Sequence, residues 1–204
     1  MWCVVLATLA SARPLDTGAW NISNDYKYLL DKGLAAEVAS IAKESGFSRI
    51  MDLGAGTGRY ANEWRASGLQ VAAYDGATNI ETLSAGVVSR HDLTAPFERC
   101  EPGEVVTSLE VAEHIPRTRQ DVYIANLVCS EPHLIVLSWA RPGQPGNGHV
   151  NGRTPEYVET LMRTQGYGRD VAATRRLRAH ASLPWFRSNI QVFVKKEKGR
   201  GDAT

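Results

Sequence analysis

The chain has 204 residues, of which 43% are hydrophobic and 22% are charged. This composition is that of an ordinary globular domain and excludes a disordered, collagen-like or disulfide-scaffold protein. The 23 basic and 22 acidic residues nearly cancel, so no bulk charge requires a polyanionic partner. The charge is unevenly divided, however, because residues 163–204 carry a net +7 and residues 1–162 a net −6.

The chain begins with an almost entirely apolar stretch that ends in Ala10-Ser11-Ala12. Two interpretations fit it. Residues 1–12 resemble a secretory signal with an A-x-A site, although no Lys or Arg precedes the apolar part. Alternatively, residues 1–23 form an apolar segment that packs on the domain or stays flexible. The stretch is too short to span a bilayer, so we expect no transmembrane span.

Cysteine usage favours a reducing compartment. Cys3, Cys100 and Cys129 are far apart and odd in number, which fits neither a metal-binding pair nor a disulfide framework. We therefore expect a cytoplasmic protein without a disulfide framework. Nothing in the sequence specifies an oligomeric state.

Segments with helical and strand patterns alternate along the rest of the chain. Apolar residues recur at helical spacing from Asp25 to Ser45, and Gly46 follows as a stop signal. Strands are predicted at residues 48–53, 69–74, 86–89, 104–109, 133–139 and 190–194, and helices at residues 59–67, 119–129 and 155–164. This alternation predicts one α/β domain over residues 24–196, with helices on both faces of a mostly parallel sheet. Beyond the six strands located by their pattern, we expect a seventh strand in this sheet. Residues 197–204 read as a disordered tail.

A glycine-rich turn follows the first strand of this domain. Glycines stand at 54, 56 and 58, and glycine lets the backbone approach a ligand closely because it adopts dihedral angles that other residues avoid. Asp75 lies 17 residues beyond Gly58, at the end of the second strand, and Asp92 ends the third. A carboxylate at the second strand end can accept hydrogen bonds from both ribose hydroxyls of a nucleoside. Together these strand ends predict a nucleoside pocket.

At these residues the chain resembles the class I S-adenosylmethionine-dependent methyltransferases, from about Asp25 to Lys196. Their first motif resembles Asp52-Leu53-Gly54-Ala55-Gly56-Thr57-Gly58, and the glycine spacing differs from the G-x-G-x-x-G of NAD-binding Rossmann proteins. The resemblance implies a Rossmann-like single domain whose last strand, Ile190–Val194, runs antiparallel to the rest. It implies S-adenosylmethionine as cofactor, bound by the following residues: Asp52, Gly54, Gly56, Gly58, Asp75, Asp92, Leu93 and Glu110. The stretch between Asp92 and Val105 is short for the family, so one of the usual helices is expected to be a loop.

A second group of polar residues follows the fourth strand. Glu110, Glu113 and His114 occur at i, i+3 and i+4, which places them on one face if the segment is helical. His149, in the glycine-rich loop of residues 140–153, is a further candidate for the same group. Either the first three residues cap the next helix and shape the pocket, or all four form a metal site with two carboxylates and two imidazoles.

This pattern resembles the E-x-x-E-H plus distant histidine of small-RNA 3′-terminal 2′-O-methyltransferases, and E-x-x-E-H also occurs in quinone-biosynthesis O-methyltransferases. The resemblance implies a divalent cation such as Mg²⁺, Mn²⁺ or Zn²⁺ that binds vicinal oxygens of the acceptor and lowers the pKa of the hydroxyl to be methylated. Without a metal, His114 or His149 is the best candidate for general base, because imidazole titrates near neutral pH. We list Glu113, His114 and His149 as catalytic candidates and regard the other histidines as structural.

The basic C-terminal third has two interpretations. Arg175, Arg176 and Arg178 precede Trp185 and Arg187, and guanidinium groups beside aromatics suit an anionic or glycosyl acceptor. The other interpretation is a solvated helix face followed by a core tryptophan.

The sequence thus predicts methyl transfer to an oxygen, rather than a nitrogen, of a small polar acceptor. Two alternatives stay open: a metal-dependent RNA ribose 2′-O-methyltransferase, and a non-catalytic module that only binds the cofactor. The chain contains no separate RNA-binding module, which favours the small-molecule acceptor over a nucleic acid. The acceptor itself is left unspecified.

Overall fold

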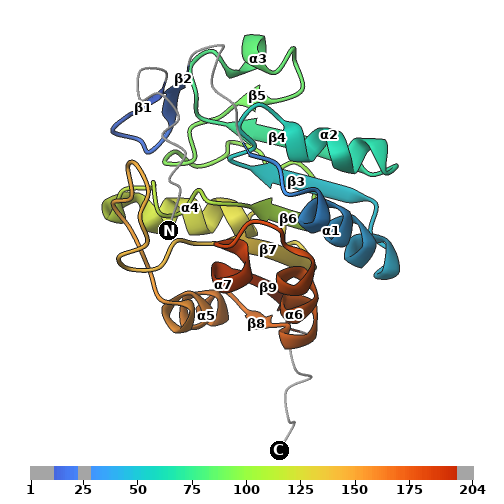
Figure 1. The fold of residues 1–204 in the computed structure, drawn as a ribbon. Helices are drawn as coiled ribbons and strands as arrows, with labels where there is room; N and C mark the ends of the chain where they lie inside the picture. The colour runs from blue at the N-terminus through green and yellow to red at the C-terminus, as the bar shows by residue number, and fades with distance from the viewer. Residues whose placement is uncertain (1–11, 23–28, 197–204) are drawn as a thin grey trace, which may run out of the picture.

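A computed structural model describes residues 12–22 and 29–196, and its central feature is a seven-stranded sheet with helices on both faces (Figure 1). The strand order is β5-β4-β3-β6-β7-β9-β8. Strands β3 to β7 pair in parallel, and β9 pairs antiparallel with both β7 and β8. The predicted α/β class, the seven strands and the antiparallel last strand are therefore confirmed.

The elements of the main domain follow one another along the chain as strand, helix, strand. Its strands are β3 (Arg49–Leu53), β4 (Gln70–Asp75), β5 (Ser89–Arg90), β6 (Val105–Ser108), β7 (Leu134–Ser138), β8 (Tyr167–Arg169) and β9 (Ile190–Lys195). Its helices are α1 (Lys32–Glu44), α2 (Arg59–Ala66), α3 (Ile80–Leu83), the 3-10 turn η1 (Arg117–Arg119), α4 (Gln120–Val128), α5 (Pro155–Thr164), α6 (Val171–His180) and α7 (Phe186–Asn189).

The sheet buries both of its faces because side chains alternate along each strand. In β7, Leu134 and Val136 join the core beneath α1 and α6, whereas Ile135 and Leu137 join the core beneath α4 and α5. All five residues of this strand are buried. The continuous apolar pattern of residues 133–139 is thus that of a central parallel strand.

Several element boundaries differ from the sequence prediction. Helix α1 begins at Lys32 rather than near Asp25, because the buried Asp31 side chain caps it there. The third strand occupies Ser89–Arg90 instead of residues 86–89, since the chain is still turning at Gly86, whose N–H donates to the Glu81 carbonyl. As predicted, the segment between Asp92 and Val105 is a loop and contains no helix.

A small antiparallel hairpin precedes the main sheet and was missed in the sequence. It comprises β1 (Ala12–Pro14) and β2 (Trp20–Ile22). Its turn is closed by the Leu15 N–H donating to the Ala19 carbonyl and the Gly18 N–H donating to the Leu15 carbonyl. The signal interpretation falls on residues that lie almost wholly outside the described part of the chain, as do the predicted helix start at Asp25 and the tail at 197–204.

The prediction that the cysteines form no disulfide framework is corrected at one pair. Cys100 and Cys129 form a disulfide, with their Cα atoms 5.8 Å apart. Cys100 lies in the segment between β5 and β6, and Cys129 caps the carboxyl end of α4. A sequence separation of 29 residues hides this pairing, because the two positions meet only when that segment packs on α4.

None of the helices in residues 12–22 and 29–196 is long and apolar enough to cross a membrane. The cytoplasmic location remains a prediction.

The buried Asp31 carboxylate joins three parts of the fold. Its Oδ1 accepts the N–H of Leu34 (3.0 Å), and its Oδ2 accepts those of Ser182 (2.7 Å) and Leu183 (2.8 Å). The Asp31 N–H in turn donates to the hydroxyl of Tyr60 (2.9 Å). One side chain thus fixes the start of α1 against the segment that follows α6.

We predict that Asp31→Ala destabilises the protein by about 2–3 kcal/mol, because it removes a helix cap and two further, partly buried hydrogen bonds from the N–H groups of Ser182 and Leu183. Asp170 is the matched control: it caps α6 through one hydrogen bond, to Ala173, so Asp170→Ala should cost only about 1 kcal/mol. Urea unfolding measures both. Equal losses in the two variants would contradict the bridging role of Asp31.

Candidate functional site

The candidate site lies at the carboxyl edge of the sheet, where the chain order reverses. From β3 the chain passes to β4 and β5 on one side, and it then returns to β6 and β7 on the other. Ligands of open α/β sheets bind at such a switch point, outside the carboxyl ends of the strands. The glycine-rich turn and the Glu110–His114 segment follow β3 and β6, so the two lie side by side there.

Gly54 brings these two segments into contact. Its φ is +84°, and a Cβ at this position would overlap the side chain of Val111. The N–H groups of Gly54 and Ala55 both donate to the Tyr74 carbonyl, at 2.8 and 2.9 Å, which draws the turn toward β4. Glycine is needed at position 54 both for its dihedral angles and for the space.

Asp75 lies against the glycine-rich turn, as predicted for a ribose-binding acid. Its Oδ2 accepts the N–H of Gly56 and its Oδ1 that of Ala77, each at 2.9 Å. Burial raises the pKa of this carboxyl, and the hydrogen bonds from Ala77 and Gly56 oppose that rise. The carboxylate is therefore held at the rim of the predicted cofactor pocket.

Asp92 and Leu93 follow β5 at the same edge. The Asp92 Oδ1 accepts the N–H and hydroxyl of Thr94, at 2.9 and 2.7 Å. The Leu93 side chain is buried, and its carbonyl accepts the side-chain amide of Asn126 at 3.1 Å. Helix α4 thus orients the segment that carries the predicted adenine contacts.

Asp52 occupies a different environment from the other candidate acids. It is buried within β3, opposite Thr107 of β6, whose hydroxyl donates to its Oδ1 at 2.7 Å. Burial raises the pKa of Asp52 to about 7. This carboxyl helps to join the two strands that present the site.

The Glu110–His114 segment is a turn and not a helix, which corrects the expected helical face. Glu110 has a φ of +55°, and the His114 N–H donates to the Val111 carbonyl. Nor does the segment cap α4, whose cap residue is Arg119.

The Glu110 carboxylate has hydrogen-bond partners outside the histidine pair. Its Oε1 accepts the hydroxyl of Ser138 (2.8 Å) and the amide of Asn189 (2.7 Å), a pair of partners that the sequence analysis missed. Burial raises the pKa of Glu110, and these two hydrogen bonds oppose the rise.

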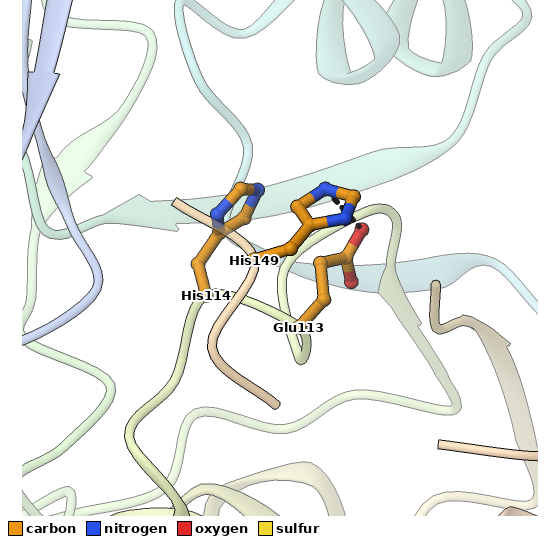
Figure 2. Close-up of side chains that lie close together, drawn as sticks. All are labelled: Glu113, His114 and His149. Atoms are coloured by element: carbon orange, nitrogen blue, oxygen red, sulfur yellow. Dashed lines mark ion pairs between the residues drawn. The ribbon is translucent and has the colours of Figure 1, made fainter. Parts of the chain in front are cut away.

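Three of the four predicted metal ligands meet. Glu113, His114 and His149 each offer a ligand atom within 4.8 Å of the others (Figure 2). The His149 Nε2 lies 3.9 Å from the Glu113 Oε1, and the centres of the two imidazole rings are 5.1 Å apart. Figure 2 shows Glu113 and His114 on one segment and His149 reaching them from another. Glu110 lies outside this cluster.

The loop of residues 140–153 is fastened to the same turn. The N–H groups of Val150 and Asn151 both donate to the Glu113 carbonyl at 2.9 Å. The Nδ1 atoms of His114 and His149 face the carbonyls of Gly148 (3.2 Å) and Gln144 (3.1 Å). Because a carbonyl can only accept, each Nδ1 carries the proton and each Nε2 keeps its lone pair for a ligand. Metal-binding histidines are commonly held in this way.

The Glu113 side chain is completely buried, and neither carboxylate oxygen has a hydrogen bond of normal geometry. Burial raises the pKa of Glu113 well above its usual value, the charge of Glu110 adds to the rise, and the nearby N–H groups of Glu113 and Ala140 oppose it. Burial likewise lowers the pKa of His114 to about 4. A buried carboxyl without a well-formed hydrogen bond, beside two imidazoles whose Nδ1 atoms face carbonyls, fits the donor set of a divalent transition metal.

The arginines of α6 contact their own chain, which contradicts the acceptor-binding interpretation for two of them. Arg176 pairs with Glu37 and Glu44, each at 2.7 Å. Arg178 donates to the Ile190 carbonyl at 2.9 and 3.0 Å. These side chains fasten α6 to α1 and β9.

The sheet order and the antiparallel β9 are those of a Rossmann-like α/β fold. No protein-family profile and no curated protein sequence matches the chain. Among solved structures it is similar to magnesium protoporphyrin IX methyltransferase (ChlM) from Synechocystis PCC 6803, with 14% identity, a TM-score of 0.62, and coverage of 81% of this chain and 83% of that one.

Two further solved structures are similar over most of their length. The methyltransferase domain of bacterial CtHen1 has 16% identity and a TM-score of 0.57, covering 81% of this chain and 98% of that one. CalS10, an amino pentose methyltransferase from Micromonospora echinaspora solved with bound S-adenosylmethionine, has 14% identity and a TM-score of 0.61, covering 79% and 90%. At such identities the likeness establishes the fold.

Proposed function

We propose that this chain is a methyltransferase that moves the methyl group of S-adenosylmethionine to an oxygen of a small polar acceptor. The observation that carries the proposal is the contact between Gly54 and Val111. It joins a turn built for a nucleoside to the segment that bears Glu113 and His114. A cofactor bound at the first would present its reactive end to the second.

The proposed cofactor residues each have a task that follows from their position. The backbone of the turn at Gly54–Gly58 passes close to the ligand, Asp75 accepts the ribose hydroxyls, and Asp92 with Leu93 borders the base. S-adenosylmethionine bound in the CalS10 structure and S-adenosylhomocysteine bound in ChlM support this choice of cofactor.

The proposed transfer site consists of Glu113, His114 and His149. When bound there, a divalent cation would supply a Lewis acid that lowers the pKa of an acceptor hydroxyl. The protein's own part is to hold two Nε2 lone pairs and one carboxylate in place, and to keep water from the reacting atoms by burial. In the absence of a cation the same Nε2 atoms can accept the hydroxyl proton.

Asp75→Asn tests the cofactor assignment. We expect it to weaken binding of S-adenosylhomocysteine by about 10–100-fold, because it replaces a charge-assisted pair of ribose contacts with a neutral group. Isothermal titration calorimetry provides the measurement, and Asp121→Asn on α4 is the control that should bind normally. Failure of the unaltered protein to bind would overturn the proposed function, and normal binding by Asp75→Asn would overturn the role of that residue.

Glu113→Gln tests the metal assignment. Mn²⁺ or Zn²⁺ should raise the melting temperature of the unaltered protein through mass action, and Glu113→Gln should abolish this rise. Without metal, Glu113→Gln should be more stable than the unaltered protein above neutral pH. The pKa of Glu113 is raised in the folded state, so the folding stability of the unaltered protein falls as pH rises through that pKa, and glutamine does not ionise. Glu98→Gln, an exposed site, is the control. A metal-induced rise that survives in Glu113→Gln would contradict the site.

A terminal ribose of RNA is the second candidate acceptor. It is favoured by the Glu113, His114 and His149 cluster, together with the likeness to the CtHen1 domain. The internal pairing of Arg176 and Arg178 argues for a small acceptor instead.

We expect formation of S-adenosylhomocysteine with small acceptors that carry neighbouring hydroxyls, at a rate almost independent of salt. An RNA substrate would instead show affinity that falls steeply with salt, because phosphate contacts release counterions. A panel of catechols, sugars and short RNAs, assayed at several salt concentrations, separates the two. Cofactor binding with no product from any acceptor would favour the non-catalytic module.

A further inference from the structure

The β1–β2 hairpin lies close to three separate parts of the site. A Cβ at Gly18 would overlap the carbonyl oxygen of His114, and a Cβ at Gly76 would lie 2.6 Å from that of Ala19. A Cβ at Gly148 would lie 3.2 Å from that of Pro14. The hairpin therefore contacts the residue after the ribose-binding acid, the His114 turn and the His149 loop. In Figure 1 it stands beside the main sheet as a separate unit.

The Trp20 side chain of the hairpin contacts the site directly. Its ring meets the His114 ring edge-on, with the centres 5.3 Å apart and the planes at 80°. It also packs against the apolar cluster at the end of β4, which includes Ala73 and Ala77. One side chain thus bridges the predicted ribose side of the pocket and the transfer side.

His114 is consequently fixed from three directions. Gly148 holds its Nδ1, His149 lies against one side of the ring, and Trp20 lies against another. An edge-to-face aromatic contact has a preferred geometry, so it restricts rotation of the imidazole. The direction of the Nε2 lone pair depends on that rotation.

The hairpin also forms a wall at the Asp92 end of the pocket. A cavity of about 480 Å³ is lined there by Asp16 and Thr17 of the hairpin turn, by Asp92 and Thr94, and by Arg119. The hairpin therefore extends over the whole length of the site, from the predicted base position to the two histidines.

We propose that the β1–β2 hairpin is the roof of the cofactor and acceptor site and that Trp20 is a positioning residue that orients the His114 ring. This inference rests on the proposed function. A roof of this kind must open for the cofactor to leave, so its contacts set the release rate. No sequence motif predicts the hairpin, and it supplies one wall of the site.

Stopped-flow release of S-adenosylhomocysteine tests the roof. Trp20→Ala should release it about tenfold faster, the effect of losing one well-packed aromatic contact, whereas Trp20→Phe should restore the original rate. Trp185→Phe, which alters a tryptophan away from the hairpin, is the control. An unchanged release rate in Trp20→Ala would overturn the proposal that the hairpin covers the cofactor site.

A second variant covers the case in which Trp20→Ala fails to fold. Pro14→Cys combined with Gly148→Cys would place two Cβ atoms 3.2 Å apart, slightly closer than the ~3.5–4.5 Å of a disulfide. Because Gly148 has a φ of +73°, the substitution strains the loop, so the comparison is made between the oxidised and reduced forms of the same variant, which share this strain. The oxidised form should release S-adenosylhomocysteine more slowly than the reduced form. The unaltered protein with and without reductant controls for Cys100–Cys129. Equal release rates in the oxidised and reduced forms would contradict closure.

The NMR signals of the His114 ring protons give a measurement that needs neither cofactor nor metal. The Trp20 ring current should displace them, Trp20→Ala should abolish the displacement, and Trp20→Phe should keep part of it. If the unaltered protein fails to bind S-adenosylhomocysteine, the proposed function falls. If the His114 signals are the same in Trp20→Ala, the positioning role falls, whatever the outcome for the cofactor.

Discussion

The buried carboxylate of Glu113 is the constraint around which the site is built. Burying an ionised carboxylate without hydrogen bonds is costly, and Glu113 is completely buried with no well-formed hydrogen bond to either oxygen. The backbone nevertheless holds it firmly, since its carbonyl receives the N–H groups of Val150 and Asn151. A sequence that keeps an unfavourable group in a fixed place sacrifices stability for a site. A positive charge between Glu113 and His149 would remove most of the cost.

The second constraint is the close approach at Gly54. A side chain at position 54 would overlap Val111 and push its segment away. The glycine-rich turn and the Glu110–His114 segment would then separate. The two halves of the proposed reaction are thus coupled by sterics. The hydrogen bond between Asp52 and Thr107 acts in the same sense, because it joins β3 to β6 directly beneath the two segments.

The sequence predicts well where pattern and local chemistry agree. Helix α5 begins at the expected Pro155, capped by Thr154, and β3 with its glycine-rich turn lies where predicted. The sequence did not predict contacts that depend on tertiary packing. The helical spacing of Glu110 and Glu113 was misleading because Glu110 has a positive φ, and no local signal places His149, 36 residues further on, against Glu113. The Cys100–Cys129 pair and the contact of Trp20 with His114 have the same origin.

The charge asymmetry of the chain now has a structural explanation that bears on the acceptor. The basic third binds the acidic part of the same molecule: Arg176 spans Glu37 and Glu44 on α1, and Lys195 pairs with Glu131 at 2.6 Å. The guanidinium groups of Arg176 and Arg178 already have partners within the chain. They are therefore not free to neutralise phosphates, on which affinity for RNA depends. The proposed transfer site itself contains one buried carboxyl and two imidazoles. An acceptor that brings hydroxyl oxygens rather than a row of phosphates is therefore the better match to this surface.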